Sequence, residues 1–170
     1  MDYHDNVWGV PEYDDLKLFE FLNLEGAQAG LSWYTVLIKE ENYRKAFSNW
    51  DPNKIVKYSD KKIQSLLANP GIIRNKLKVN AVITNSKTYL DMKSEGTSLS
   101  DYLWNYVDGK PIVNHWKDMS ELPAQTELSQ RISKDLKKKG YKFVGPTIVY
   151  AFMQAVGMVD DHMADCWRRG

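Results

Sequence analysis

The sequence lacks the features of an exported, disulfide-stabilised or membrane protein. Its single cysteine, Cys166, cannot form a disulfide within the chain, and the sequence opens on polar and acidic residues rather than on a signal peptide. No apolar run approaches the roughly 20 residues that a membrane-spanning helix needs. We therefore expect a cytoplasmic protein with no membrane partner, and its 170 residues are enough to bury a core in one globular unit.

An excess of either charge is also missing, since 23 lysines and arginines against 22 acidic residues leave a net charge of +1. The bulk basic footprint of many nucleic-acid-binding proteins is therefore absent. The charge is nevertheless unevenly distributed, with a net −6 in residues 1–25 and a net +5 in residues 131–142. The basic stretch has two interpretations, a surface that binds a polyanion and an ordinary solvated helix face.

Strand-like alternation is scarce and helix-capping residues recur along the chain, which predicts an all-α fold of many short helices. The first helix is expected to be capped by Asp14-Asp15 and to carry the apolar residues Leu16, Phe19 and Leu22. A long helix should follow the turn at residues 69–71, and residues 109–119 should be irregular. Further helices are predicted to begin at Ser32, Asp51-Pro52, Ser59-Asp60 and Ser98 or Ser100. Gly96 and Gly140 are each predicted to end a helix, and one more helix is predicted over residues 146–156.

The Asn69-Pro70-Gly71 turn between two predicted helices is typical of a helix–hairpin–helix that holds a phosphate. Backbone N–H groups of such a turn, and of the first turn of the following helix, favour an anion. Gly71 would allow close backbone approach, Ile72 would anchor the turn to the core, and the cations from Arg74 to Lys78 could pair with phosphates. An ordinary turn between two core helices is the alternative.

Two segments, residues 3–11 and 24–33, combine aromatic rings with a carboxylate. Trp and Tyr faces attract cations, and a partly buried carboxylate at Glu25 would need a positively charged partner. A flat cationic base stacked on Trp33 would be such a partner. The alternative is structural, with Trp8 and Trp33 in the core and Glu25 capping a turn.

Four stretches stand in a distinctive order: YHDNVWGVPE at 3–12, LEGAQAGLSW at 24–33, PGIIRNKLKVNAVITN at 70–85 and KKKGYKFVGPTIVYAFMQAVGMVDDH at 137–162. Together with Cys166 they resemble the DNA-3-methyladenine glycosylase I family, constitutive bacterial enzymes that excise alkylated adenine. The resemblance runs from residue 3 to residue 166.

The resemblance implies an all-α helix–hairpin–helix glycosylase that flips a damaged nucleotide out of double-stranded DNA and hydrolyses its N-glycosidic bond. An N3-alkylated adenine is already positively charged, so it leaves readily and stacks weakly. Glu25 would be the catalytic residue that complements this cation, with Tyr3 and Trp33 stacked on the base and Trp8 walling the pocket. The implied DNA contacts are Gln28, Gly30 and Leu31 as a wedge in the duplex gap, and Gly71, Ile72 and Arg74 in the hairpin.

Related helix–hairpin–helix enzymes carry a catalytic aspartate soon after the hairpin, but residues 84–87 contain none. No lysine stands out as a Schiff-base nucleophile either. We therefore expect a monomeric, monofunctional hydrolase that releases free 3-methyladenine and has no strand-cleaving lyase step.

The resemblance also implies a structural zinc ion, held in the family by two cysteines and two histidines. His4, His162 and Cys166 match three of these ligands, and the spacing of the last two would place both on one helical face. The fourth ligand, a cysteine upstream of His4 in the family, has no counterpart in the sequence. A start chosen downstream of the true one, or a lost metal site, would each account for this. His115 has no predicted partner and is expected at the surface.

The chain, residues 1–170, is expected to form one glycosylase unit. Residues 35–110 would form the hairpin lobe, and residues 1–34 and 111–170 would join in a second lobe. One alternative function is a non-catalytic helix–hairpin–helix DNA-binding module whose base pocket has decayed. Another is a glycosylase for a different alkylated purine.

Overall fold

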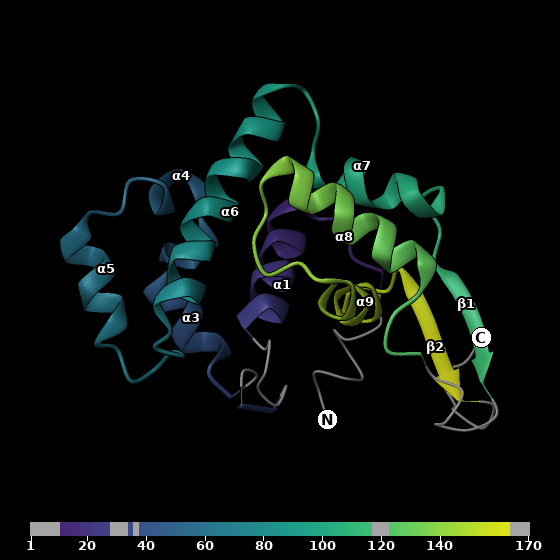
Figure 1. Ribbon diagram of the computed structural model, residues 1–170, viewed down its shortest axis with the longest axis horizontal. Coiled ribbons are helices and arrows are strands. Elements are labelled where there is room, and N and C mark those ends of the chain that lie inside the picture. Colours follow the sequence, from purple (N-terminus) through teal and green to yellow (C-terminus); the bar gives the residue numbers. More distant parts are fainter. Residues whose placement is uncertain (1–10, 28–33, 36–37, 117–122, 164–170) are drawn as a thin grey trace.

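The computed structural model describes residues 11–27, 34–35, 38–116 and 123–163, and helices dominate this part of the chain, which confirms the all-α prediction. In Figure 1, one side of the molecule is formed by α3 (Glu40–Ala46), α4 (Pro52–Ile55), α5 (Asp60–Leu67) and α6 (Lys76–Ser94). The other side is formed by α8 (Glu127–Lys139), α9 (Pro146–Ala155) and a small sheet, and α1 (Asp15–Ala27) lies between the two. The division into lobes at residues 35 and 110 stays a prediction.

Side-chain caps determine where several helices begin. Asp14 Oδ2 accepts the Lys17 N–H at 3.0 Å, and Ser59 Oγ accepts the Lys62 N–H at 3.2 Å. Asp51, Asn75 and Ser98 cap α4, α6 and α7 (Leu99–Trp104) in the same way. The predicted starts after Asp14, Asp51, Ser59 and Ser98 are therefore confirmed, because a cap is a contact between residues close in sequence.

The central helix α1 is almost entirely enclosed. Every residue from Leu18 to Ala27 is buried, and the helix contacts α6, α7 and α9. Of the three apolar residues predicted for this helix, Phe19 and Leu22 are buried and Leu16 is 47% exposed. It lies in the first turn of α1, ahead of the enclosed stretch.

A two-stranded parallel sheet joins segments that are distant in the sequence. Strand β1 (Ile112–Trp116) pairs with β2 (Val159–Met163), and the register places His115 opposite His162. Parallel strands need a long connection, which here includes α8 and α9. The prediction of an irregular segment over 109–119 is wrong at β1, and the surface position expected for His115 stays a prediction. Within the described residues, none of the helices combines the length and apolar character required to span a bilayer.

Candidate functional site

The side chain of Glu25 is buried in the last turn of α1 with no counter-ion among the described residues. It is 3% exposed. Burial raises the pKa of this carboxyl from 4.5 to about 8, because the charged form loses its hydration. The protonated acid is therefore favoured at neutral pH while no cation is near, and a cation brought to the carboxylate would favour the ionised form.

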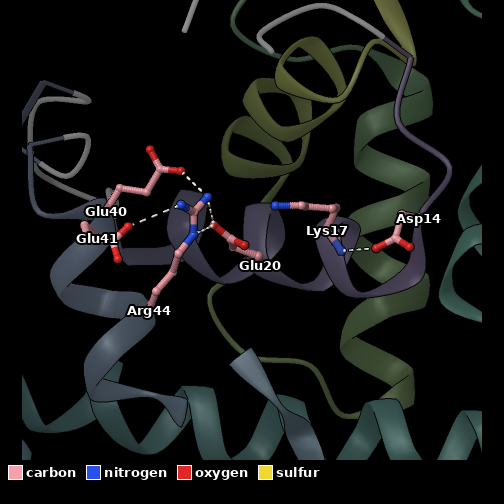
Figure 2. A network of polar contacts seen from close by, with 6 residues as sticks. All are labelled: Asp14, Lys17, Glu20, Glu40, Glu41 and Arg44. Atoms are coloured by element: carbon pink, nitrogen blue, oxygen red, sulfur yellow. Dashed lines mark hydrogen bonds and ion pairs between the residues drawn. The ribbon is translucent and has the colours of Figure 1, made fainter. Parts of the chain in front are cut away.

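Glu20 is also buried on α1, but it is paired. Arg44 of α3 brings Nε and Nη2 to 3.0 Å from one Glu20 oxygen. Figure 2 shows that the same guanidinium also contacts Glu40 at 2.9 Å and Glu41 at 3.5 Å. Hydrogen bonds between charged groups of this kind are stronger than hydrogen bonds between neutral groups. Glu20 therefore serves to join α3 to α1.

The Asn69-Pro70-Gly71 turn uses several of its own N–H groups. The Asn69 side chain accepts the Gly71 N–H at 2.8 Å, and the Tyr43 hydroxyl accepts the Ile73 N–H at 3.1 Å. Tyr43 is itself stacked on Phe47 and Trp50. These N–H groups are not free to bind the phosphate that the sequence predicts for the turn.

Free donors remain at the start of α6. Asn75 caps this helix, while the backbone N–H groups of Arg74, Lys76 and Leu77 have no acceptor in the described part of the chain. The side chains of Arg74 and Lys76 are exposed. A helix N-terminus with open N–H groups and two exposed cations suits an anion. The candidate phosphate site therefore moves from the turn itself to residues 74–77.

Gly71 and Ile72 shape the turn from inside the protein. A Cβ at Gly71 would lie 3.0 Å from Asn69 Oδ1 and 3.1 Å from Asn42 Cγ, so any other residue there would require these two side chains to shift. Ile72 is 2% exposed and belongs to the core. Whether either residue contacts DNA stays a prediction.

Two residues of α6 have roles that the sequence did not reveal. Lys78, grouped above with the phosphate-binding cations, instead donates from Nζ to the Ala27 carbonyl at 2.9 Å. Asn85 is buried and donates from Nδ2 to Asn23 at 3.0 Å and to the Lys142 carbonyl at 3.2 Å. An asparagine among apolar helix positions was the available signal, but its partners lie 62 and 57 residues away in the sequence.

Most of the predicted pocket lies outside the described residues. This applies to the aromatic wall, the wedge and two of the zinc ligands: Tyr3, His4, Trp8, Gln28, Gly30, Leu31, Trp33 and Cys166.

His162 belongs to strand β2, so the helical spacing proposed for it and Cys166 is wrong at His162. A strand backbone repeats every two residues rather than every 3.6 or so as in a helix, so the predicted helical geometry does not apply at residue 162. Among the residues that the structure describes, there is no group of three or more His, Cys, Asp or Glu side chains that could hold a metal ion.

The basic stretch at residues 131–142 lies largely on α8 and contacts tyrosine rings. Arg131 lies 5.5 Å from the centre of the Tyr106 ring, and Lys139 lies 5.6 Å from that of Tyr102. Asp135 accepts a hydrogen bond from the Tyr106 hydroxyl at 2.5 Å. These cations therefore contribute to packing through cation–π contacts, and polyanion binding by this stretch stays a prediction.

Known proteins resemble this chain over nearly its whole length. The model of the Methyladenine glycosylase family matches residues 1–169. The DNA-3-methyladenine glycosylase of Haemophilus influenzae is 51% identical over 166 residues, which cover 98% of this chain and 90% of that protein. A crystal structure of a 3-methyladenine DNA glycosylase I superposes with a TM-score of 0.97 at 47% identity, covering 99% of this chain and 93% of that one. The 3-methyladenine DNA glycosylase I of Staphylococcus aureus, in a structure describing 3-methyladenine recognition, superposes with a TM-score of 0.95 at 38% identity, covering 99% and 90%.

Proposed function

The chain belongs to the methyladenine glycosylase family, and on this premise we propose that it removes 3-methyladenine from alkylated DNA by hydrolysing the N-glycosidic bond. This reaction begins base-excision repair. The observation that carries the proposal is the Glu25 carboxyl, which is 3% exposed and has no counter-ion among the described residues. An unpaired buried charge is costly, and a cationic base in the pocket would offset that cost.

Charge separates the damaged base from the normal one. An N3-methylated adenine in DNA is positively charged, whereas adenine is neutral. The incoming cation would lower the pKa of Glu25 from about 8, so that the proton leaves as the base enters. The attraction is strong because little water screens it. Tyr3 and Trp33 would stack on the base and Trp8 would close the pocket. The bond to a charged purine is already weak, which agrees with the absence of an aspartate at residues 84–87.

The DNA would be held beside this pocket. The backbone N–H groups of Arg74, Lys76 and Leu77 and the side chains of Arg74 and Lys76 would bind a backbone phosphate. Gln28, Gly30 and Leu31 would fill the gap left by the flipped nucleotide. The protein would act as a monomer on double-stranded DNA in the cytoplasm. It would leave the DNA strand intact, because the mechanism includes no Schiff-base lysine.

Base release from a methylated duplex tests the proposal. The protein should release free 3-methyladenine, detected by chromatography and mass spectrometry, without cutting the strand. Trp33→Ala should abolish release while changing duplex affinity little. Normal binding of methylated DNA without release of any base would refute the proposal and would favour the non-catalytic DNA-binding module. Base release from a panel of oligonucleotides with other alkylated purines would test the alternative of a glycosylase that prefers a different lesion.

We infer a structural zinc ion as well, with His4, His162 and Cys166 as ligands. The support is the donor set, because imidazole and thiolate are preferred zinc ligands. Elemental analysis of the purified protein and of Cys166→Ser tests this. Zinc that is present in the first and lost in the second would agree with the assignment, and zinc-free wild-type protein would contradict it.

A further inference from the structure

Two side chains of α6 hold the end of α1 that carries Glu25. Lys78 Nζ donates to the Ala27 carbonyl at 2.9 Å, and Asn85 Nδ2 donates to Asn23 Oδ1 at 3.0 Å. Residues seven apart on α6 and four apart on α1 each share one face of their helix. Glu25 therefore lies between two anchored positions, and both anchors come from the helix that begins at the candidate phosphate site.

The last turn of α1 has a particular need for a cation. Carbonyl groups at a helix C-terminus lack intrahelical partners and carry partial negative charge. The last turn of α1 contains no basic residue, and Glu25 adds a carboxyl group to it. The ammonium group of Lys78 satisfies the terminal Ala27 carbonyl and brings positive charge from the neighbouring helix. This contact opposes fraying of the turn that presents Glu25.

The same helix end is confined on another side by the segment after α8. A Cβ at Gly26 would lie 3.1 Å from Phe143 Cβ, so the helix and this segment are in close contact. Asn85 holds the adjacent Lys142 by accepting its N–H at 2.7 Å and donating to its carbonyl at 3.2 Å. A cavity of about 20 Å³, enough for roughly one water molecule, remains between α1, α6 and Phe143. The end of α1 is therefore closely held on both sides.

We propose that Lys78 is a positioning residue for base excision, which holds the last turn of α1, and with it the Glu25 carboxylate, in the geometry that receives the flipped base. The proposal rests on the proposed glycosylase function. It separates Lys78 from its neighbours Arg74 and Lys76, whose side chains are exposed. Burial also lowers the pKa of Lys78, as expected for an ammonium group turned away from bulk water.

Four variants of the full-length protein separate positioning from phosphate binding. Lys78→Met removes the ammonium group but keeps an unbranched side chain, and Lys78→Arg keeps both the charge and a donor. Lys87→Met is the matched control, because Lys87 is exposed on the same helix and has no polar partner in the described part of the chain. Lys76→Met shows the effect of removing an exposed cation from the candidate phosphate site.

The variants are compared by single-turnover excision from methylated duplex with enzyme in excess, and by Kd for undamaged duplex at several salt concentrations. Lys78→Met should lower the excision rate constant about tenfold, with Kd within twofold of wild type and an unchanged salt dependence. Lys78→Arg should recover most of the rate, and Lys87→Met should behave as wild type. Lys76→Met should instead weaken binding and lower the salt slope by about one. If Lys78→Met either matches Lys76→Met or keeps the wild-type rate, the proposal is overturned.

Amide hydrogen exchange of the free protein gives a readout that does not depend on excision. In Lys78→Met, exchange at residues 25–27 should accelerate while residues 18–22 keep their protection; equal protection at 25–27 would overturn the proposal. If Lys78→Met does not fold, Lys78→Arg tests the proposal instead. This variant must keep both the wild-type excision rate and the protection of residues 25–27, and the loss of either would overturn the proposal. A wild-type protein that releases no 3-methyladenine would refute the glycosylase function, while the exchange result would still test the role of Lys78 at the helix end.

Discussion

Glu20 and Glu25 lie on the same helix and are almost equally buried, at 5% and 3% exposure. Glu20 has two nitrogens of Arg44 at 3.0 Å, as Figure 2 shows. Glu25 has no counter-ion in the described part of the chain, and burial raises its pKa to about 8. The two side chains leave the helix about 140° apart, so only Glu20 is directed at α3.

The comparison shows that depth of burial alone does not tell what a carboxylate does. A buried carboxylate with a cation beside it helps to join two helices. One without a cation destabilises the empty protein and remains available to a charged ligand, which is the usual arrangement at a functional site. Glu20 therefore belongs to the scaffold and Glu25 to the chemistry.

Among the changes that test this comparison, the largest expected effect is the loss of excision in Glu25→Gln. Removing the charge that complements the cationic base should lower single-turnover release of 3-methyladenine by about 100-fold or more, similar to the loss of a key electrostatic contact in other enzymes. Glu20→Gln is the matched control and should lower stability while keeping the excision rate of the folded protein. Equal losses in both variants would show that the comparison is wrong.

The pH dependence of stability should also separate the two positions. Between pH 4.5 and about 8, Glu25 holds a proton in the folded protein but not in the unfolded chain. The folded state then binds more protons, so this group makes the free energy of unfolding fall as pH rises, by about 1.4 kcal/mol per pH unit. Urea unfolding of wild type and Glu25→Gln at pH 5, 6.5 and 8 measures this. The stability of Glu25→Gln relative to wild type should rise toward pH 8. An equal pH dependence of the two proteins would contradict a Glu25 side chain that is buried with no counter-ion in the described part of the chain.

Arg44→Met should turn Glu20 into a group more like Glu25. It leaves a buried carboxylate without its main cation, and we expect a loss of about 1–2 kcal/mol, less than for a fully buried pair because Arg44 is partly exposed. Thermal unfolding of wild type and of Arg44→Met at one pH checks this, and a variant as stable as wild type would mean that the contact between Arg44 and Glu20 does not stabilise the fold.

The smallest effect is expected for Arg74→Met, which should leave both glutamates unaffected. Loss of one exposed cation at the start of α6 should weaken duplex binding a few-fold and lower the salt slope by about one. The free energy of unfolding should stay within about 0.5 kcal/mol of wild type. Titration of a labelled duplex at several salt concentrations checks this, and an unchanged slope would exclude residue 74 from the phosphate site.

Much of the fold could be predicted because its signals are local. The caps at Asp14, Asp51, Ser59 and Ser98 accept from N–H groups two or three residues away, so both partners can be recognised in one short stretch of sequence. The strands could not be predicted in this way. Residues 112–116 become a strand only because residues 159–163 lie beside them.

The same distinction between local and long-range contacts applies to the candidate site. The sequence pointed to Glu25 through its resemblance to a known family, and to the hairpin through the Asn69-Pro70-Gly71 turn. It did not show that the N–H groups of residues 71 and 73 are already used, nor that Lys78 turns inward. These outcomes depend on Tyr43 and Ala27, partners 30 and 51 residues away.

By itself, the sequence determined the helical character of the chain, its family and the presence of a carboxylate at position 25, because residue types and short spacings are written directly in it. Only the tertiary structure decided that this carboxylate is buried with no cation beside it among the described residues, while Glu20 is paired. The physical reason is that desolvation and charge pairing depend on which distant helices pack around a position, and the local sequence of α1 contains neither α3 nor α6.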